Sequence, residues 1–371
     1  MPNMPKEAIS ASQAVCVLIL FLFGSSALFN IDAHTAQDSW ISLLFALIYA
    51  LPVLMIYARL MKLFPEKDLF EIIKLLFGKV TGKVLVALMT WYALHLAALV
   101  LRNFSEFIRI SVMFQTPQIV IMIIMMLLVV YMTKSGIETM GRWSIFMMPF
   151  ILTISLLTVI LSINKIDIGN IYPIMEHGLG TIAAHAFDFF SFPYAETVVF
   201  LCLAGCYKRK ESPYKLYVYS ALTGTAILLL VMLRNILLLG IPMGIADYFP
   251  SFTAVSILDI GGFLAHIEGS TATNLILAGI IKITVCLAAA TKGMASLFGI
   301  QNYKNIVFPL AVLTIALGFV IYRSTLEMIN FLGLYPYYAI PFQLAIPILV
   351  WVVGEIKVRK MRKKETKEIS S

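Results

Sequence analysis

The chain has 371 residues, of which 60% are hydrophobic and 13% are charged, and its formal net charge is +8. A soluble domain carries about 45–50% apolar and about 25% charged residues, so this composition excludes a soluble enzyme and indicates a polytopic membrane protein. The excess of Lys and Arg does not indicate nucleic-acid binding, because these residues lie in loops and a tail, where the positive-inside rule and anionic lipid account for them.

Ten apolar segments predict ten transmembrane helices in an all-α protein, because each spanning helix needs about 20 mostly apolar residues. In chain order the segments are 12–30, 39–60, 84–112, 118–131, 143–163, 179–206, 216–240, 273–298, 306–322 and 338–353. Ser10 stands directly before the first segment, where a helix N-cap is expected.

Two connecting segments differ from ordinary loops. In segment 61–83 apolar residues alternate with lysines at helical spacing, which predicts an amphipathic helix at the membrane interface, with a solvated loop helix as the alternative. Segment 241–270 contains no Lys or Arg. It is interrupted by Asp247, Pro250, Asp259, Gly261, Gly262 and Glu268. We therefore expect an extracytoplasmic lid there rather than a further span.

The basic residues predict how the chain is oriented. About 22 Lys and Arg residues flank alternate connections and fill the tail 354–371, whereas the opposite loops hold little beyond Lys165 and Arg323. Cytoplasmic loops carry the basic excess. The first side is therefore expected to be cytoplasmic, and an even number of spans places both termini there.

Two of the apolar segments, five spans apart, contain interruptions. The first holds Gly24-Ser25-Ser26 and the sixth holds Ser191-Phe192-Pro193-Tyr194. Interrupted helices at corresponding positions of two halves are typical of inverted-repeat transporters, whose ligand site lies at the midplane. Backbone groups freed inside the membrane need a polar partner or ligand. The alternative is a small-residue packing surface and an ordinary proline kink.

This pattern predicts one membrane domain built from two halves of five helices. The first half is 10–163 and the second is 164–353, with a cytoplasmic N-terminus at 1–9 and the basic tail at 354–371. An odd number of helices inserts the second half upside down relative to the first. The two interruptions then face each other near the bilayer centre.

Ionisable residues inside spans are costly and mark functional or structural sites. The apolar segments contain Arg102, Glu106, Asp188, Glu196, Arg234 and Lys282. Arg102 and Glu106 stand four residues apart in the outer half of one helix, which favours a structural ion pair. Arg234 is expected to have a similar structural role. Glu196 and Lys282 are expected near mid-depth. Lys282 either supplies a fixed cation in place of a coupling ion or pairs with Glu196 for stability.

No motif indicates catalysis, a bound metal or a cofactor. The five histidines have no paired spacing, and the four cysteines lie in apolar segments without a C-x-x-C pair. There is also no nucleotide-binding glycine loop and no G-x-S-x-G elbow. The sequence therefore indicates a binding or transport protein rather than an enzyme.

Six short motifs resemble the B subunit of GerA-type endospore germinant receptors. In order they are Gln37-Asp38-Ser39-Trp40-Ile41-Ser42, Arg102-Asn103-Phe104-Ser105-Glu106-Phe107, Gly136-Ile137-Glu138-Thr139, Phe192-Pro193-Tyr194-Ala195-Glu196, Phe249-Pro250-Ser251 and Ile281-Lys282-Ile283-Thr284-Val285. The resemblance runs from about Ile9 to Lys357. That family belongs to the amino acid, polyamine and organocation transporter (APC) superfamily. The resemblance therefore implies a five-plus-five inverted-repeat, LeuT/APC-like fold with broken helices 1 and 6.

The resemblance also implies a function. It predicts a nutrient sensor of the spore inner membrane that works with an A subunit and a lipoprotein C subunit. A small nutrient, an amino acid or a sugar, would bind in a midplane pocket between helices 1, 3, 6 and 8. By position, the implied ligand-binding residues are Gly24, Ser25, Ser26, Leu99, Phe192, Tyr194, Thr284 and Ala288.

Two other functions fit the same sequence pattern. A secondary transporter would move the same ligand by alternating access. A membrane scaffold would keep only a vestigial pocket. Composition and helix interruptions fit the receptor and the transporter equally.

Overall fold

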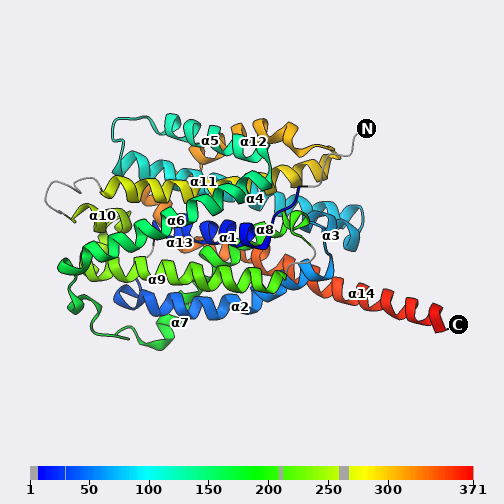
Figure 1. Ribbon diagram of the computed structural model, residues 1–371, viewed down its shortest axis with the longest axis horizontal. Helices are drawn as coiled ribbons and strands as arrows, with labels where there is room; N and C mark the ends of the chain where they lie inside the picture. Colours follow the sequence, from blue (N-terminus) through cyan, green and yellow to red (C-terminus); the bar gives the residue numbers. More distant parts are fainter. Residues whose placement is uncertain (1–6, 30, 209–211, 259–266, 371) are drawn as a thin grey trace.

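The computed structural model describes residues 7–29, 31–208, 212–258 and 267–370 of the chain (Figure 1). Throughout these ranges the regular structure is helical, and the one extended pairing is a bridge between Ile9 and Tyr207. Asp259, Gly261 and Gly262 of the expected lid lie outside the described residues.

The α-helices are joined by short 3₁₀ and π turns. In chain order they are α1 (Ala11–Ser26), α2 (Ser39–Leu63), α3 (Leu69–Phe77), α4 (Val80–Ser111), α5 (Gln118–Ser135), α6 (Ile137–Ser162), α7 (Gly178–Phe189), α8 (Val198–Leu201), α9 (Pro213–Ala246), α10 (Pro250–Ser256), α11 (Ile267–Phe298), α12 (Val307–Val320), α13 (Thr325–Ile340) and α14 (Ile346–Ser370).

Eight helices in the described ranges are long and apolar enough to cross a membrane. They are α2, α4, α5, α6, α9, α11, α12 and the joined pair α13 and α14. The two remaining predicted spans are α1 and the interrupted helix, residues 178–206, which comprises α7, α8 and the irregular turns around them. Ten spans result, as the sequence predicts, and the two that lack a long regular helix are the first and the sixth.

The first span begins with a strong cap and ends early. Ser10 accepts a hydrogen bond from the backbone of Gln13, whose side chain bonds back to Ser10, which forms a capping box. α1 has 16 residues, which is about 24 Å of helix at 1.5 Å per residue. That is shorter than the roughly 30 Å hydrocarbon core. Its last turn, Gly24 to Ser26, is therefore held inside the protein, where all three residues are buried.

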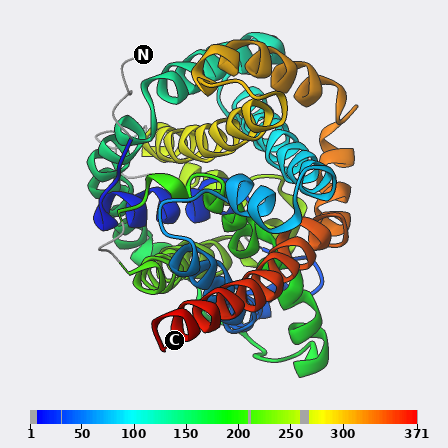
Figure 2. The same cartoon turned by 90° about the vertical axis from the view of Figure 1, so that its right-hand side faces the viewer.

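The helices form a bundle with α1 and α11 inside it. α5 and α12 cover one side and α2 and α7 the opposite side (Figures 1 and 2). α11 is the most buried of the long helices, with 83% of its apolar stretch inside the protein. We call the end that holds Glu7, α3 and the C-terminal part of α14 the tail end. The far end holds residues 31–38, residues 112–117 and α10.

The amphipathic segment at the tail end is a helix, but shorter than its pattern suggests. α3 is capped by Asp68 and ends at Gly78, whose φ of +75° terminates it. Its apolar residues Leu69, Phe70 and Ile73 are buried. They pack against the protein, mainly α4 and α14, rather than presenting an open apolar face to lipid.

The segment expected to be a lid folds as the end of α9 followed by α10. α9 kinks at Gly240, where φ is +65°, and continues past Pro242 to Ala246. α10 packs against α9 and α11. The described part of the lid is thus a short helix fixed to the bundle.

The last span begins earlier than the sequence indicates. The apolar run suggested a start at 338, whereas α13 begins at Thr325 and continues through a π turn at Pro341–Ala345 into α14. Gly333, Pro336 and Pro341 make this stretch read as a loop. Inside a membrane protein such residues are tolerated in helices because neighbours satisfy the freed backbone groups.

Candidate functional site

The interrupted helix loses its regular form halfway along. The backbone leaves helical geometry at Phe192, with φ −128° and ψ 102°, between α7 and α8. Gln343 of the π turn compensates for this: its side-chain amide donates to the carbonyl of Ser191 and accepts from the Ser191 hydroxyl, each at 2.9 Å. The hydroxyl of Tyr57 on α2 lies 3.2 Å from the carbonyl oxygen of Ala195 and 2.5 Å from that of Gln343, so its one proton goes to the nearer acceptor, Gln343. The carbonyl of Ser191, freed by the break, is therefore satisfied by a side chain of the last span.

The break in the first span lies slightly later than expected. α1 stays helical through Gly24 and Ser25 and stops at Ser26, and no regular helix follows until Ala36 in the residues described. The carbonyl of Ala27 accepts a hydrogen bond from Ser251 of α10. The Ser26 hydroxyl is buried without a partner among the described atoms. The small residues Gly24 and Ser25 thus form the end of a half-helix rather than the gap itself.

A buried ion pair joins these two irregular regions. The ammonium of Lys282 on α11 lies 2.5 Å from Glu196 Oε2 in the interrupted helix and 2.9 Å from the Ser25 hydroxyl of α1. Neither charged side chain has any exposed surface. The ammonium also lies over the rings of Phe21 and Phe192, at 4.9 and 4.7 Å from their centroids. Carboxylate, hydroxyl and two aromatic faces together replace the water that a buried cation loses.

A chain of hydrogen bonds extends from the carboxylate. Tyr335 of α13 donates to Glu196 Oε1 at 2.6 Å. Because that bond uses the only hydroxyl proton of Tyr335, Tyr92 of α4 donates to the Tyr335 oxygen at 2.9 Å, and Gln343 donates to Tyr92 at 2.9 Å. We call this set the central polar network. Its members are Ser25, Tyr92, Ser191, Glu196, Lys282, Tyr335 and Gln343.

The structure gathers only some of the expected ligand-binding residues around Lys282. Ser25 and Phe192 contact its ammonium. Gly24 lies beside its side chain, since a Cβ added at Gly24 would be 3.4 Å from the Lys282 Cδ.

Two other residues of that set, Tyr194 and Thr284, hydrogen-bond to groups other than Lys282. Tyr194 shares a 2.5 Å hydrogen bond with Thr225 of α9. Thr284 donates to the carbonyl of Ile280 on its own helix at 2.6 Å. Leu99 and Ala288 are each 5% exposed on α4 and α11. Their part in ligand binding stays a prediction.

Sequence reasoning missed three members of the central polar network: Tyr92, Tyr335 and Gln343. A search for charges inside spans cannot find them, because phenol and amide side chains are uncharged. One signal was present, since Gln343 is an amide inside an apolar span and such a group needs partners.

Arg102 and Glu106 form a second polar cluster near the far end. Arg102 Nη2 lies 3.7 Å from Glu106 Oε2, and Arg102 Nη1 donates to the carbonyls of Gly318 and Phe319 at 3.5 and 3.4 Å, close to the C-terminal end of α12. The cation therefore meets the negative end of a helix dipole. The expected ion pair is present, and it also fastens α4 to α12.

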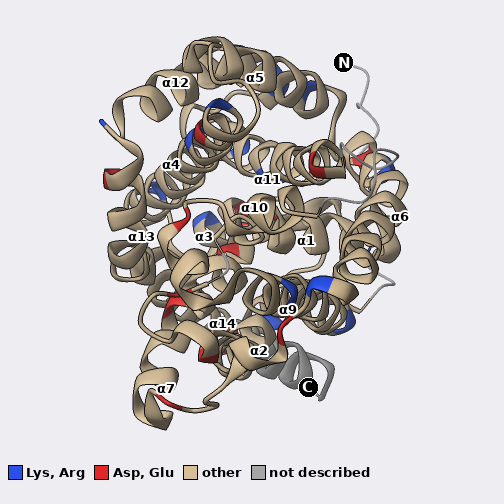
Figure 3. Cartoon of the chain, turned by 90° about the vertical axis from the view of Figure 1, so that its left-hand side faces the viewer, with Lys and Arg blue, Asp and Glu red and all other residues tan. Residues whose placement is uncertain are grey.

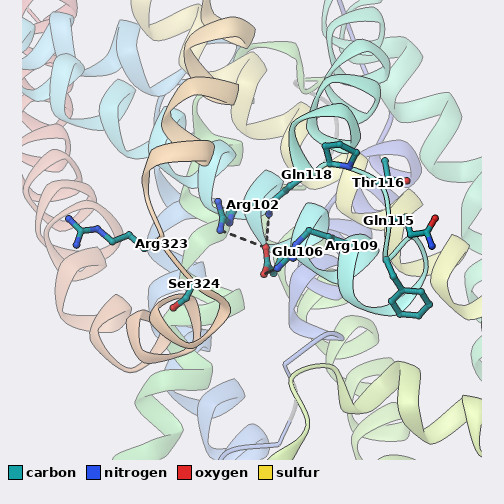
Figure 4. A pocket seen from close by; sticks show the side chains of 10 residues that line it. Arg102, Glu106, Arg109, Gln115, Thr116, Gln118, Arg323 and Ser324 are labelled. Carbon is teal, nitrogen blue, oxygen red and sulfur yellow. Dashed lines mark hydrogen bonds and ion pairs between the residues drawn. The ribbon is translucent and has the colours of Figure 1, made fainter.

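Glu106 binds more groups than the sequence suggested. Its oxygens accept from Arg109 at 2.5 Å and from Gln118 at 2.6 Å (Figure 4), and they also accept from Thr325. Gln118 and Thr325 are the first residues of α5 and α13. The carboxylate therefore lies at two helix N-termini, where negative charge is favoured.

A cavity of about 490 Å³ opens above this cluster. We call it the arginine pocket; it is lined by Arg102, Glu106, Arg109, Phe114, Gln115, Thr116, Pro117, Gln118, Arg323 and Ser324. Figure 3, which views the far end, shows basic and acidic segments adjoining on α4.

Arg234 is buried in a hydrogen-bond cluster that contains no carboxylate among the described residues. Its guanidinium donates to Thr158 at 2.7 Å, to the Asn235 side chain at 2.6 Å and to the carbonyl of Ser251 at 3.1 Å. Ser251 in turn donates to Ala27 after α1. Arg234 therefore ties α6, α9 and α10 to the end of the first half-helix. Its structural role stays a prediction.

Three histidines that are scattered in the sequence come together at the far end. His34 and His185 stack with ring centroids 4.4 Å apart, and Nδ1 of His185 lies 3.1 Å from Asp188. His177 Nδ1 lies 3.2 Å from Asp38 nearby. No group of His, Cys, Asp and Glu in the described residues is arranged to hold a metal ion. Asp188 thus belongs to a partly exposed surface cluster.

At the tail end, Glu7 connects three segments. Its carboxylate lies 2.6 Å from Lys304, accepts from Tyr303 at 3.1 Å and accepts from the backbone of Ile137 at 3.3 Å. Burial acts to raise the pKa of Glu7, but these partners outweigh it and hold the pKa below its ordinary value. At Asp68 burial prevails, and it raises the pKa of that carboxyl to about 6.

Comparison with known sequences finds a matching family and several similar proteins. A family profile described as "Spore germination protein" matches residues 8–326. Spore germination protein KB of Bacillus subtilis (strain 168) is 25% identical over 370 residues, which cover 98% of this chain and 99% of that protein. Putative spore germination protein YfkT of the same organism is 22% identical over 322 residues, which cover 86% of this chain and 88% of that protein.

Two solved structures share the fold. MHP1, a nucleobase-cation-symport-1 family transporter in a closed conformation with bromovinylhydantoin bound, superposes with a TM-score of 0.71 at 13% identity, covering 92% of this chain and 78% of that one. MhsT in complex with L-phenylalanine gives a TM-score of 0.68 at 13% identity, and the match covers 94% of this chain and 89% of that one. Both have the LeuT-type transporter fold, which confirms the predicted fold class.

Proposed function

Because this chain belongs to the family of spore germination proteins, we propose that it is the nutrient-sensing membrane subunit of a spore germination receptor. It binds a small nutrient, an amino acid or a sugar, between α1, the interrupted helix, α4 and α11. An A subunit and a lipoprotein C subunit are its partners, and the spore inner membrane is its location. Both termini face the cytoplasm, in line with the basic residues around the tail end.

The observation that carries the proposal is the central polar network. It joins the end of α1 to the interruption of the sixth span through Lys282 and Glu196. Both regions have backbone groups and hydroxyls in the membrane interior that can serve a polar ligand. The Ser26 hydroxyl, which has no hydrogen-bond partner among the described atoms, is one such group.

A ligand signals only by binding one arrangement of the helices more tightly than another. The ion pair links three elements, α1, the interrupted helix and α11. A nutrient that contacts Ser25 or Phe192 therefore changes the surroundings of Lys282. This change would move the interrupted helix, and the partner subunits would respond to that movement.

The second candidate function is secondary transport of the same ligand. The fold favours it, since MHP1 is described as a transporter. In this case Lys282 would act as a fixed cation where an ion-driven transporter binds its coupling ion. Receptor and transporter share the ligand site and differ in whether the ligand crosses the membrane.

One experiment tests the proposal and separates the candidates. The purified chain is titrated with labelled amino acids and sugars, and the same preparation is reconstituted into proteoliposomes for uptake. Saturable binding without accumulation supports the sensor, and gradient-driven accumulation supports the transporter. If no nutrient binds, both are wrong. A scaffold would also tolerate Gly24→Phe with unchanged nutrient response, although the new side chain would press on Lys282.

A further inference from the structure

The arginine pocket carries more positive than negative charge. Among the described residues, three arginines line it, against one carboxylate, that of Glu106. Glu106 has no exposed surface, and its two oxygens are covered by Arg109, Gln118 and Thr325. An anion in the cavity would therefore meet guanidinium groups while the carboxylate stays behind them.

Part of the donor capacity of these arginines is unused. Arg102 is 5% exposed, and its Nε has no hydrogen-bond partner among the described atoms. The Nε of Arg109 is likewise buried and unpartnered. Among the described contacts, Arg323 is engaged through its backbone N–H, which donates to the exposed Glu327 at 2.7 Å. Figure 4 shows the Arg323 side chain extended away from Glu106.

Two helices begin at the pocket and add to its positive potential. Gln118, the first residue of α5, lines it together with the N-cap Pro117, and so does Ser324, the N-cap of α13. The N-terminal end of a helix carries about half a positive charge, which favours bound phosphate or carboxylate groups. Arginine adds paired donors that suit the oxygens of a phosphate.

The pocket is bordered by apolar side chains that face outward. Phe114 lines it and is 75% exposed, and Val320 and Leu326 on the neighbouring helices are 78% and 58% exposed. Below the pocket, α5 presents an outward apolar face made of Ile119, Val120, Ile123, Ile124, Leu127 and Leu128. A molecule that binds both the arginine pocket and the apolar face of α5 needs an anionic headgroup and a long apolar part.

We propose that the arginine pocket binds the phosphate headgroup of an anionic phospholipid, whose acyl chains lie along the outward face of α5. The excess positive charge selects an anionic headgroup over one that carries its own cation. The apolar border selects a lipid over free phosphate. Because Glu106 fastens α4 to α5 and α13, a bound lipid would stabilise the junction of these three helices.

The test uses the full chain, purified in a neutral detergent and stripped of lipid. Dioleoyl phosphatidylglycerol or dioleoyl phosphatidylcholine is added, and bound lipid is counted by native mass spectrometry while thermal unfolding is followed. Glycerol phosphate and inorganic phosphate at the same concentration form two further arms. Phosphatidylglycerol should bind more tightly than phosphatidylcholine and raise the unfolding temperature.

Variants place the effect at this pocket. Arg323→Gln and Arg109→Gln should each weaken phosphatidylglycerol binding about fivefold, since one basic residue near an anionic headgroup contributes about 1 kcal/mol and about 1.4 kcal/mol is tenfold. Arg142→Gln is the matched control: Arg142 is an exposed arginine that pairs with Glu138 at 3.4 Å and lines a different cavity, with Glu7, at the tail end. It should leave binding unchanged.

Three results would overturn the proposal. The first is equal binding of the two phospholipids. The second is unchanged binding in Arg323→Gln, a variant that should fold normally because no described partner engages its side chain. The third is full competition by inorganic phosphate, which would make the pocket a site for free oxyanions instead.

Discussion

Lys282 on α11 and Glu196 in the interrupted helix form an ion pair of 2.5 Å with no exposed surface on either side chain. Removing two charges from water costs several kcal/mol per ion, so a buried pair adds little net stability by itself. It does impose a geometry, because each charge is tolerated only beside the other. The pair therefore fixes the position of the interrupted helix relative to α1 and α11.

Lys282→Met should destabilise the protein by about 3–5 kcal/mol, because Glu196 would be left buried without its cation. Adding Glu196→Gln to that variant should recover most of the loss, since no charge then remains. Thermal unfolding in detergent measures both effects. Nutrient binding separates the two roles of Lys282: a purely structural pair predicts recovered binding in the double variant, whereas a fixed cation for the ligand predicts that binding stays lost. Intact folding and binding in Lys282→Met would contradict both roles.

Tyr335→Phe should lower stability by about 1.5–3 kcal/mol, the range for a hydrogen bond to a charged group. The change removes the donor to Glu196 and leaves the Tyr92 hydroxyl without its acceptor. Tyr337→Phe is the matched control, since Tyr337 lies on the same helix and is 71% exposed. Equal unfolding temperatures for the two variants would show that the network does not stabilise the fold.

Several features of the fold could be predicted because each depends on local composition. Ten spans follow from apolar length, and the interruption of the sixth from Pro193 and its neighbours. The contact between Lys282 and Glu196 was among the expectations because a charge inside a membrane needs a partner. Its distance confirms the contact, and its function stays a prediction.

Other features depend on contacts between distant residues, and no local pattern encodes them. Tyr92 and Tyr335 are 243 positions apart and meet only because α4 and α13 pack side by side. Gln343 reaches Ser191 across 152 positions. The early start of α13 was missed for a different reason, since its glycine and prolines are loop signals in water but are accommodated in this bundle.

Gly279→Ala should destabilise the protein by about 1–3 kcal/mol through overpacking. α11 and α4 form an extensive interface, and a Cβ at Gly279 would lie well inside contact distance of the buried Phe104 ring. Gly333→Ala in α13 is the control, because no described atom lies within 4 Å of its added Cβ. There the change should stabilise by about 0.5–1 kcal/mol, the helix preference of alanine over glycine. Shifts of the same sign in both variants would contradict the close approach of α4 and α11.

Asp68→Asn should raise stability at neutral pH and remove one pH dependence of unfolding. Burial raises the pKa of Asp68 from 3.8 to about 6 in the folded protein. Between these values the folded state holds a proton that the unfolded state has released, so the contribution of Asp68 to stability falls as pH rises from about 4 to about 6. Above that pH it stays at its lower value. Asparagine mimics the protonated form and is also a good N-cap for α3.

Unfolding temperatures of the wild type and the variant between pH 4 and 8 measure the effect, and the difference between them should grow with pH and then level off. The pKa of Glu7 is lowered in the folded protein, so its contribution to stability rises with pH. That contribution is the same in the wild type and the variant and cancels in the difference. A constant difference across the range would show that Asp68 titrates normally.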